Sequence, residues 1–281
     1  MKFIVMLFVC LLIAPAAFAM EKTSTKKQVN KSWKPIAFDE TAARLPVGYN
    51  GLDAKQFYKL FKSKVGKLKK GEFETTEEFE KRTEDKDVLL APINTSALYA
   101  FRIDYINSKY NADSQTYETD NSGSVRFCSD DSPLGWVTCK LDSISHKERK
   151  YTGNNSFGAT INITKRTGLN FALAIPKKSS AINQVFEHIK PGDGHQGGYL
   201  YRDKFDFPLV DARKLGKKNI SVLFVGRVTD AKILEGRSLI SEPTIDYPFD
   251  DFIQEEAMPF ELKKIIYYVV QTGEILHQKS F

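Results

Sequence analysis

GEFETTEEFEKR, residues Gly71–Arg82, separates a short helical part of this chain from a long strand-rich part. Within it, Thr75 and Glu78 have the spacing of a capping box, in which the threonine hydroxyl and the glutamate carboxylate each accept a hydrogen bond from the other residue's backbone amide. Gly71 is suited to end the helix before it, because glycine tolerates the left-handed conformation. The stretch therefore predicts a joint between two short helices.

The helix before the joint is expected to begin after Asp53, with Gln56 completing its cap. Its apolar residues recur at helical spacing and define one face: Phe57, Leu60, Phe61, Val65 and Leu68. This face predicts a helix that covers a core. The lysines of the same helix leave a helix lying on a membrane surface as the alternative.

The helix after the joint is expected to run from Thr76 to about Asp85. Phe73 and Phe79 flank its cap in the manner of a hydrophobic staple. This arrangement predicts that the start of the second helix is pinned to a core.

The segment Gly71–Arg82 resembles the pattern GEFET-x-x-E-[FY]-x-x-R of uncharacterised exported bacterial proteins. The resemblance covers this stretch alone. It implies a bacterial envelope setting, and it carries no activity or site residues.

The rest of the chain alternates strand patterns with turns. Ile220–Val228 is the most strand-like run and is expected in the centre of a sheet, and Leu262–Val270 is a second strong strand. Phe157–Lys165 and Leu169–Ile175 also alternate, and Arg166-Thr167-Gly168 between them predicts a turn. Strands that meet strands with few helices between them predict an α+β fold, mainly an antiparallel sheet with a short N-terminal helical pair packed on it.

The N-terminus has the pattern of an export signal. Lys2 is a positive n-region, Phe3–Ile13 is an apolar h-region, and Ala17–Ala19 is an A-x-A cleavage site before Met20. The apolar run is too short for a comfortable membrane span, and the rest of the chain has no second long apolar run. The sequence therefore predicts cleavage at about Ala19/Met20 and a periplasmic or secreted protein with no transmembrane span in the mature chain.

Composition then sets the domain boundaries. Residues 20–35 are polar and lysine-rich, which predicts a disordered basic tether after the signal at 1–19. Residues 36–281 are expected to form a single α+β domain, and a subdivision would fall near 176–200. A hydrophobic content of 42% and an aromatic content of 12% are those of a folded protein.

Two cysteines, Cys128 and Cys139, remain after the signal is removed. An even number in an exported chain predicts a disulfide, here closing a hairpin whose tip carries the turn residues Asp130-Asp131-Ser132-Pro133. His146 is the nearest histidine, and the spacing fits no zinc pattern, so no metal site is predicted.

The formal net charge is +6. Much of it lies in the tether and at the end of the first helix, on Lys62, Lys64, Lys67, Lys69 and Lys70. Cations near the end of a helix complement its dipole, and they also attract anionic lipid or another envelope polymer. Export argues against nucleic acid as a partner.

Catalytic chemistry has few candidates in this sequence. The chain has no nucleophile elbow, no H-E-x-x-H and no P-loop, and the glycine-rich segment Gly192–Gly198 lies outside the strand-to-helix context of a dinucleotide fold, so no cofactor is predicted. His195 lies within that segment, and Asp250 and Asp251 lie in an acidic segment, Pro243–Asp251, that is predicted as a loop. These three residues are the candidates for a hydrolytic site.

These observations favour a non-enzymatic periplasmic or secreted protein that binds another envelope component, either an envelope protein or an anionic membrane surface. The first alternative is an exported hydrolase with a site assembled from loop residues. The second is a peripheral membrane protein that uses the lysine-rich helix.

Overall fold

The computed structural model describes residues 33–68, 70–121, 128–129, 135–154, 158, 160–189, 198–216 and 220–281. The chain divides into two compact units, Met1–Trp33 and Lys34–Phe281, and the fold given below is that of the second unit. The predicted signal and His195 lie outside the described residues. No helix in the described ranges is long and apolar enough to cross a membrane.

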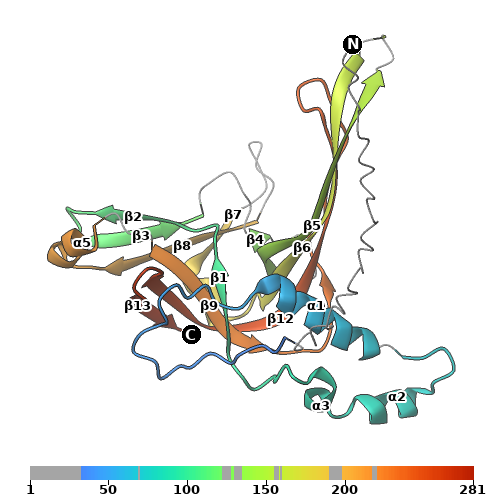
Figure 1. The fold of residues 1–281 in the computed structure, drawn as a ribbon, viewed down its shortest axis with the longest axis horizontal. Coiled ribbons are helices and arrows are strands. Elements are labelled where there is room, and N and C mark those ends of the chain that lie inside the picture. The colour runs from blue at the N-terminus through green and yellow to red at the C-terminus, as the bar shows by residue number, and fades with distance from the viewer. Residues whose placement is uncertain are drawn as a thin grey trace, which may run out of the picture. The chain divides into compact units, whose positions relative to one another are not determined.

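The helical elements are short and the strands are numerous (Figure 1). The helices are α1 (Ala54–Val65), η1 (Gly66–Leu68), α2 (Thr76–Thr83), α3 (Lys86–Leu90), α4 (Ser180–Val185) and α5 (Leu209–Leu215). The strands are β1 (Tyr99–Ile103), β2 (Asn107–Asn111), β3 (Thr116–Asp120), β4 (Cys128–Ser129), β5 (Trp136–Asn154), β6 (Thr160–Pro176), β7 (Phe186–Ile189), β8 (Gly198–Asp206), β9 (Ile220–Val228), β10 (Leu234–Glu235), β11 (Leu239–Ser241), β12 (Phe249–Val269) and β13 (Ile275–Ser280).

The described strands form one 13-stranded sheet in the order β1-β9-β12-β6-β5-β4-β8-β3-β2. Strands β10, β11 and β13 are added on β12, and β7 is added on β8. β12 therefore has two sets of neighbours: β11, β10 and β9 follow one another along one side, and β6 and β13 lie along the other.

The predicted fold class is wrong. Of the residues that the structure describes, 49% lie in strands and 18% in helices, and the sheet is mixed. β12 runs parallel to β6 from Phe249 beside Thr164 to Pro259 beside Ala174. The alternation of side chains is the same in parallel and antiparallel strands, so the sequence pattern did not distinguish the two directions.

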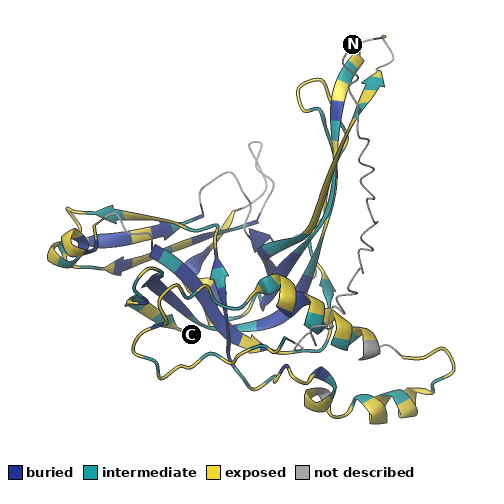
Figure 2. Ribbon diagram, viewed as in Figure 1, coloured by how far each residue is buried: buried dark blue, intermediate teal, exposed yellow. Residues whose placement is uncertain are grey.

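The predicted helical pair is also wrong, because only its first member packs on the sheet. α1 begins at the N-cap Asp53 as predicted, and its Phe57 and Phe61 are fully buried. α2 begins with the predicted capping box of Thr75 and Glu78, but none of its residues is buried (Figure 2).

The predicted staple does not form, since Phe73 is 95% exposed. Local polar contacts hold this joint instead: Arg82 Nε lies 2.7 Å from Glu74 Oε1, and the Gly71 amide donates to Glu74 Oε2 at 2.8 Å. These contacts fix the start of α2 without a core behind it.

The prediction for the most strand-like run is confirmed. β9 has the predicted bounds, Ile220–Val228. β12 is much longer than predicted, and it absorbs the end of the segment predicted as a loop. The predicted turn at Arg166-Thr167-Gly168 is wrong, because β6 continues through it as one strand of 17 residues.

The core lies between α1 and the sheet and between β8 and the β9–β12 pair. The Phe57 ring lies 5.2 Å from the rings of Tyr99 and Phe101, centroid to centroid. Tyr201 of β8 packs against Phe224 of β9 at 6.0 Å although the two strands do not pair. The sheet therefore curls so that β8 covers β9.

The predicted disulfide is present. Cys128 of β4 pairs with Cys139 of β5 in the ladder, and their sulfur atoms are bonded. Both residues are buried, so the bridge ties the short strand β4 to the long strand β5 inside the core.

Replacing both cysteines, Cys128→Ser with Cys139→Ser, is expected to lower the free energy of unfolding by about 3 kcal/mol, because the bridge restricts the unfolded chain. Urea denaturation of the oxidised protein, the reduced protein and the double variant measures the effect. The reduced protein and the double variant should agree with each other. A double variant as stable as the oxidised protein would contradict the prediction.

Candidate functional site

The candidate site lies on four neighbouring strands, β11, β12, β6 and β5. Ser241 is paired with Asp251, Asp251 with Arg166, and Arg166 with Glu148. Paired residues project to the same side of a sheet, so these four side chains form one row on one face. We call this face the clamp face and define it by this row.

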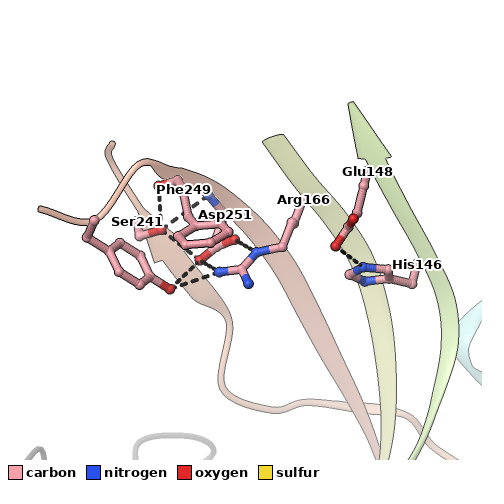
Figure 3. Close-up of polar contacts among 7 residues, drawn as sticks. His146, Glu148, Arg166, Ser241, Phe249 and Asp251 are labelled. Carbon is pink, nitrogen blue, oxygen red and sulfur yellow. Dashed lines mark hydrogen bonds and ion pairs between the residues drawn. The ribbon is translucent and has the colours of Figure 1, made fainter. Parts of the chain in front are cut away.

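Arg166 and Asp251 form a bidentate ion pair in this row (Figure 3). Arg166 donates from Nε to Asp251 Oδ1 at 2.5 Å and from Nη2 to Oδ2 at 2.7 Å. Asp251 Oδ2 also accepts from the hydroxyls of Ser241 at 2.9 Å and Tyr247 at 3.1 Å. These four residues, which we call the clamp, therefore hold β6, β12, β11 and the loop after β11 together.

The electrostatics of the clamp keep Asp251 ionised. Its side chain is 0% exposed, and the Arg166 guanidinium holds its pKa below the usual range of an aspartate. Both carboxylate oxygens are occupied by donors, so Asp251 is neither a proton donor at neutral pH nor an open ligand. Its role in this geometry is structural.

Aromatic side chains close the clamp. The guanidinium of Arg166 lies 4.0 Å from the centroid of the Phe249 ring, and the Tyr247 ring packs 4.9 Å from that of Phe249. On β5, His146 Nε2 lies 3.0 Å from Glu148 Oε1 (Figure 3). The Phe249 ring therefore adds a cation–π contact to the ion pair of Arg166.

The opposite side of the same strands, which we call the open face, carries two further rows of paired residues. The first is Ile240, Phe252, Thr167 and Lys147, and the second is Asp250, Lys165 and Arg149. Ile240 is 67% exposed and Phe252 is 46% exposed. Exposed apolar side chains at one margin and cations at the other characterise this face.

The structure places Asp250 and Asp251 on opposite faces, since they are consecutive residues of β12. Asp250 lies on the open face, where its Oδ2 accepts from the Tyr151 hydroxyl at 3.1 Å and pairs with Lys165 Nζ at 3.1 Å. The two carboxylates therefore do not meet. His195 lies outside the described residues, so its grouping with either aspartate stays a prediction.

Sequence reasoning missed Glu255 of β12. This residue comes four positions after Asp251 on the same strand, so it projects to the same side of the sheet as the clamp face. Its Oε1 is buried without a hydrogen-bond partner among the described residues. Thr138 and the amide of Arg237 donate to the carboxylate, and burial raises its pKa to about 7. Gly236 covers the group so closely that an added Cβ would lie 2.4 Å from Oε1. Glu255 is followed directly by Glu256, and the sequence carries no signal that the first of these two glutamates is buried.

A second buried polar cluster ties β8 to β12 and β13. The Tyr267 hydroxyl bonds Asp203 and the Tyr201 hydroxyl, and Lys279 donates from Nζ to Asp203 Oδ1 at 2.6 Å. Burial raises the pKa of both tyrosines and lowers the pKa of His277, which stacks on Phe205. The phenols therefore stay protonated and act as hydrogen-bond donors inside the core.

The lysine-rich helix α1 packs its apolar face on the sheet, as the first of its two predicted roles requires. Tyr58 lies 5.1 Å from Phe171, ring to ring, and its hydroxyl donates to Glu256 Oε2 at 2.7 Å. Lys62 Nζ donates to Glu256 as well, at 2.8 Å. Neither the apolar face of α1 nor Lys62 is therefore available to a membrane.

Comparison with protein-family models, with curated proteins and with solved structures found no match. In the described part of the chain, no group of three or more His, Cys, Asp or Glu side chains is arranged to hold a metal ion.

Proposed function

We propose that this protein is an exported, non-enzymatic binding protein of the bacterial cell envelope, periplasmic or secreted, which holds another envelope component on the open face. The observation that carries the proposal is the paired position of Ile240 and Phe252, two large apolar side chains exposed side by side on adjacent strands. Exposed apolar groups of this kind gain free energy when a partner covers them.

The clamp supports this use of the open face. Arg166, Asp251, Ser241 and Tyr247 fasten β11 and its following loop from the other side of the sheet. Ile240 and Phe252 are therefore held in place before a partner arrives, which reduces the entropy that binding must overcome. A hydrolytic role draws no support from Asp250 and Asp251, since both are occupied in ion pairs.

Ile240→Ser with Phe252→Ser is expected to reduce co-sedimentation of the purified protein with a bacterial envelope fraction at least tenfold, because about 3 kcal/mol of apolar burial is lost. The matched control is Val88→Ser with Val210→Ser, since these two side chains are comparably exposed and lie on other elements. The control should sediment like the wild type. The proposal would be contradicted if the two double variants sedimented equally, or if the wild type did not sediment with the envelope fraction at all.

A further inference from the structure

The open face has the layout of a planar contact rather than a groove. Its apolar margin, Ile240 and Phe252, lies on β11 and β12, and Lys147 and Arg149 lie on β5. Three strand spacings separate β11 from β5, a distance of about 14 Å. Because all these side chains project from one side of the sheet, a partner that contacts both margins must itself be broad and flat.

The charge of this face is positive. Lys147 and Arg149 are exposed, and in the described ranges neither lies within ion-pair distance of a carboxylate. Lys165, which lies opposite Arg149 on β6, is exposed and pairs with Asp250, the one acidic group in the two rows. Three cations against one carboxylate favour an anionic partner.

The edge of the sheet offers little to an extended peptide. β11 has three residues and β10 has two, and the chain between them leaves the ladder at Gly236–Ser238. Such a short, interrupted edge presents few backbone groups for strand addition. A peptide along this edge would also be separated from Lys147 and Arg149 on β5 by three strands, β11, β12 and β6.

We propose that the open face docks on an anionic phospholipid surface, with Ile240 and Phe252 entering the headgroup region and Lys147, Arg149 and Lys165 contacting lipid phosphates. This inference rests on the proposed function and names the envelope component that it requires. Apolar side chains beside cations on one face are the combination by which proteins bind anionic interfaces. The contact would use the sheet and not the lysine-rich helix, whose Lys62 is paired with Glu256.

Sedimentation with protein-free vesicles of phosphatidylethanolamine and phosphatidylglycerol at low salt tests the proposal. Each surface cation contributes about fivefold to partitioning, which is about 1 kcal/mol at 1.4 kcal/mol per tenfold. Removing two cations with Lys147→Gln and Arg149→Gln should therefore reduce binding about 25-fold. Raising the salt to 0.5 M should weaken wild-type binding strongly, because screening shortens the reach of the charges.

The matched control is Lys109→Gln with Lys178→Gln, since these exposed lysines lie on β2 and after the far end of β6. It should bind as the wild type does, and circular dichroism should show that all variants are folded. Wild type that binds the envelope fraction but not the vesicles, or that loses envelope binding after protease treatment, would overturn this inference and leave the proposed function intact. Wild type that binds neither would overturn both.

Discussion

Replacing Arg166 with alanine is expected to lower the free energy of unfolding by about 3 kcal/mol, because it leaves the carboxylate of Asp251 buried without its cation. Asp251 is 0% exposed and receives two hydrogen bonds from Arg166. Ser241 and Tyr247 still donate to Asp251 in the variant, but neither of them carries a charge. Urea denaturation at pH 7 measures the difference.

The adjacent ion pair provides the control. Lys165 and Asp250 lie next to Arg166 and Asp251 on the same strands, but their side chains are 47% and 24% exposed. Lys165→Ala should therefore change stability by less than about 1 kcal/mol. Equal losses in the two variants would show that the clamp is no stronger than a surface pair.

Acid gives an independent measure of the clamp. Arg166 holds the pKa of Asp251 below its usual range, so the stabilisation from this group is present above the usual aspartate pKa. It is lost as the pH falls through the depressed pKa, when Asp251 takes up a proton. The stability difference between the wild type and Arg166→Ala should shrink over that range. A difference that stays constant into acid would contradict the assignment of the charge.

Features that depend on residues close in sequence could be predicted. The Asp53 cap, the Thr75–Glu78 capping box and the strand Ile220–Val228 all formed at the expected positions. The disulfide between Cys128 and Cys139 is of the same kind, since the two cysteines are only 11 positions apart. In each case the responsible contacts lie within one turn, one strand or one hairpin.

Gly168 shows why the middle of the sheet could not be predicted. Its position after Arg166-Thr167 resembles turn chemistry, but the residue lies inside the continuous strand β6. An added Cβ would lie 2.6 Å from the carbonyl oxygen of Ser145, beside an irregularity in the pairing of β5. The glycine permits a close approach of another strand, which a sequence pattern does not distinguish from a turn.

The clamp depends on the parallel pairing of β6 with β12. Arg166 and Asp251 are 85 residues apart, and they meet only because Phe249 is in register with Thr164. Alternation alone places each residue on a face of its own strand, but it does not identify the neighbouring strand. An arginine in an otherwise strand-like run is the one signal that could have marked Arg166 as a partner of a distant carboxylate.

Glu255→Gln is expected to remove a large part of the pH dependence of stability between pH 4.5 and about pH 7. Burial raises the pKa of Glu255 from its usual 4.5 to about 7 in the folded protein. Because the pKa of Glu255 is higher in the folded protein than in the unfolded chain, its contribution to stability is fully present below the unfolded pKa. This contribution is lost as the pH rises through the folded pKa. At about 1.4 kcal/mol per pKa unit, the wild type should lose about 3 kcal/mol from this group by pH 8.

The neutral amide that Glu255→Gln introduces removes this loss while keeping an acceptor for Thr138 and the Arg237 amide, so the variant should exceed the wild type in stability at pH 8 and match it below the unfolded pKa of 4.5. Lys140 and Arg237 act against the effect, because both cations favour the ionised form. Glu74→Gln is the control, since the pKa of Glu74 is about 2 and its charge is constant over this range. Urea denaturation at several pH values should give a flatter curve for Glu255→Gln alone, whereas parallel curves for all three proteins would mean that Glu255 is ionised and solvated throughout.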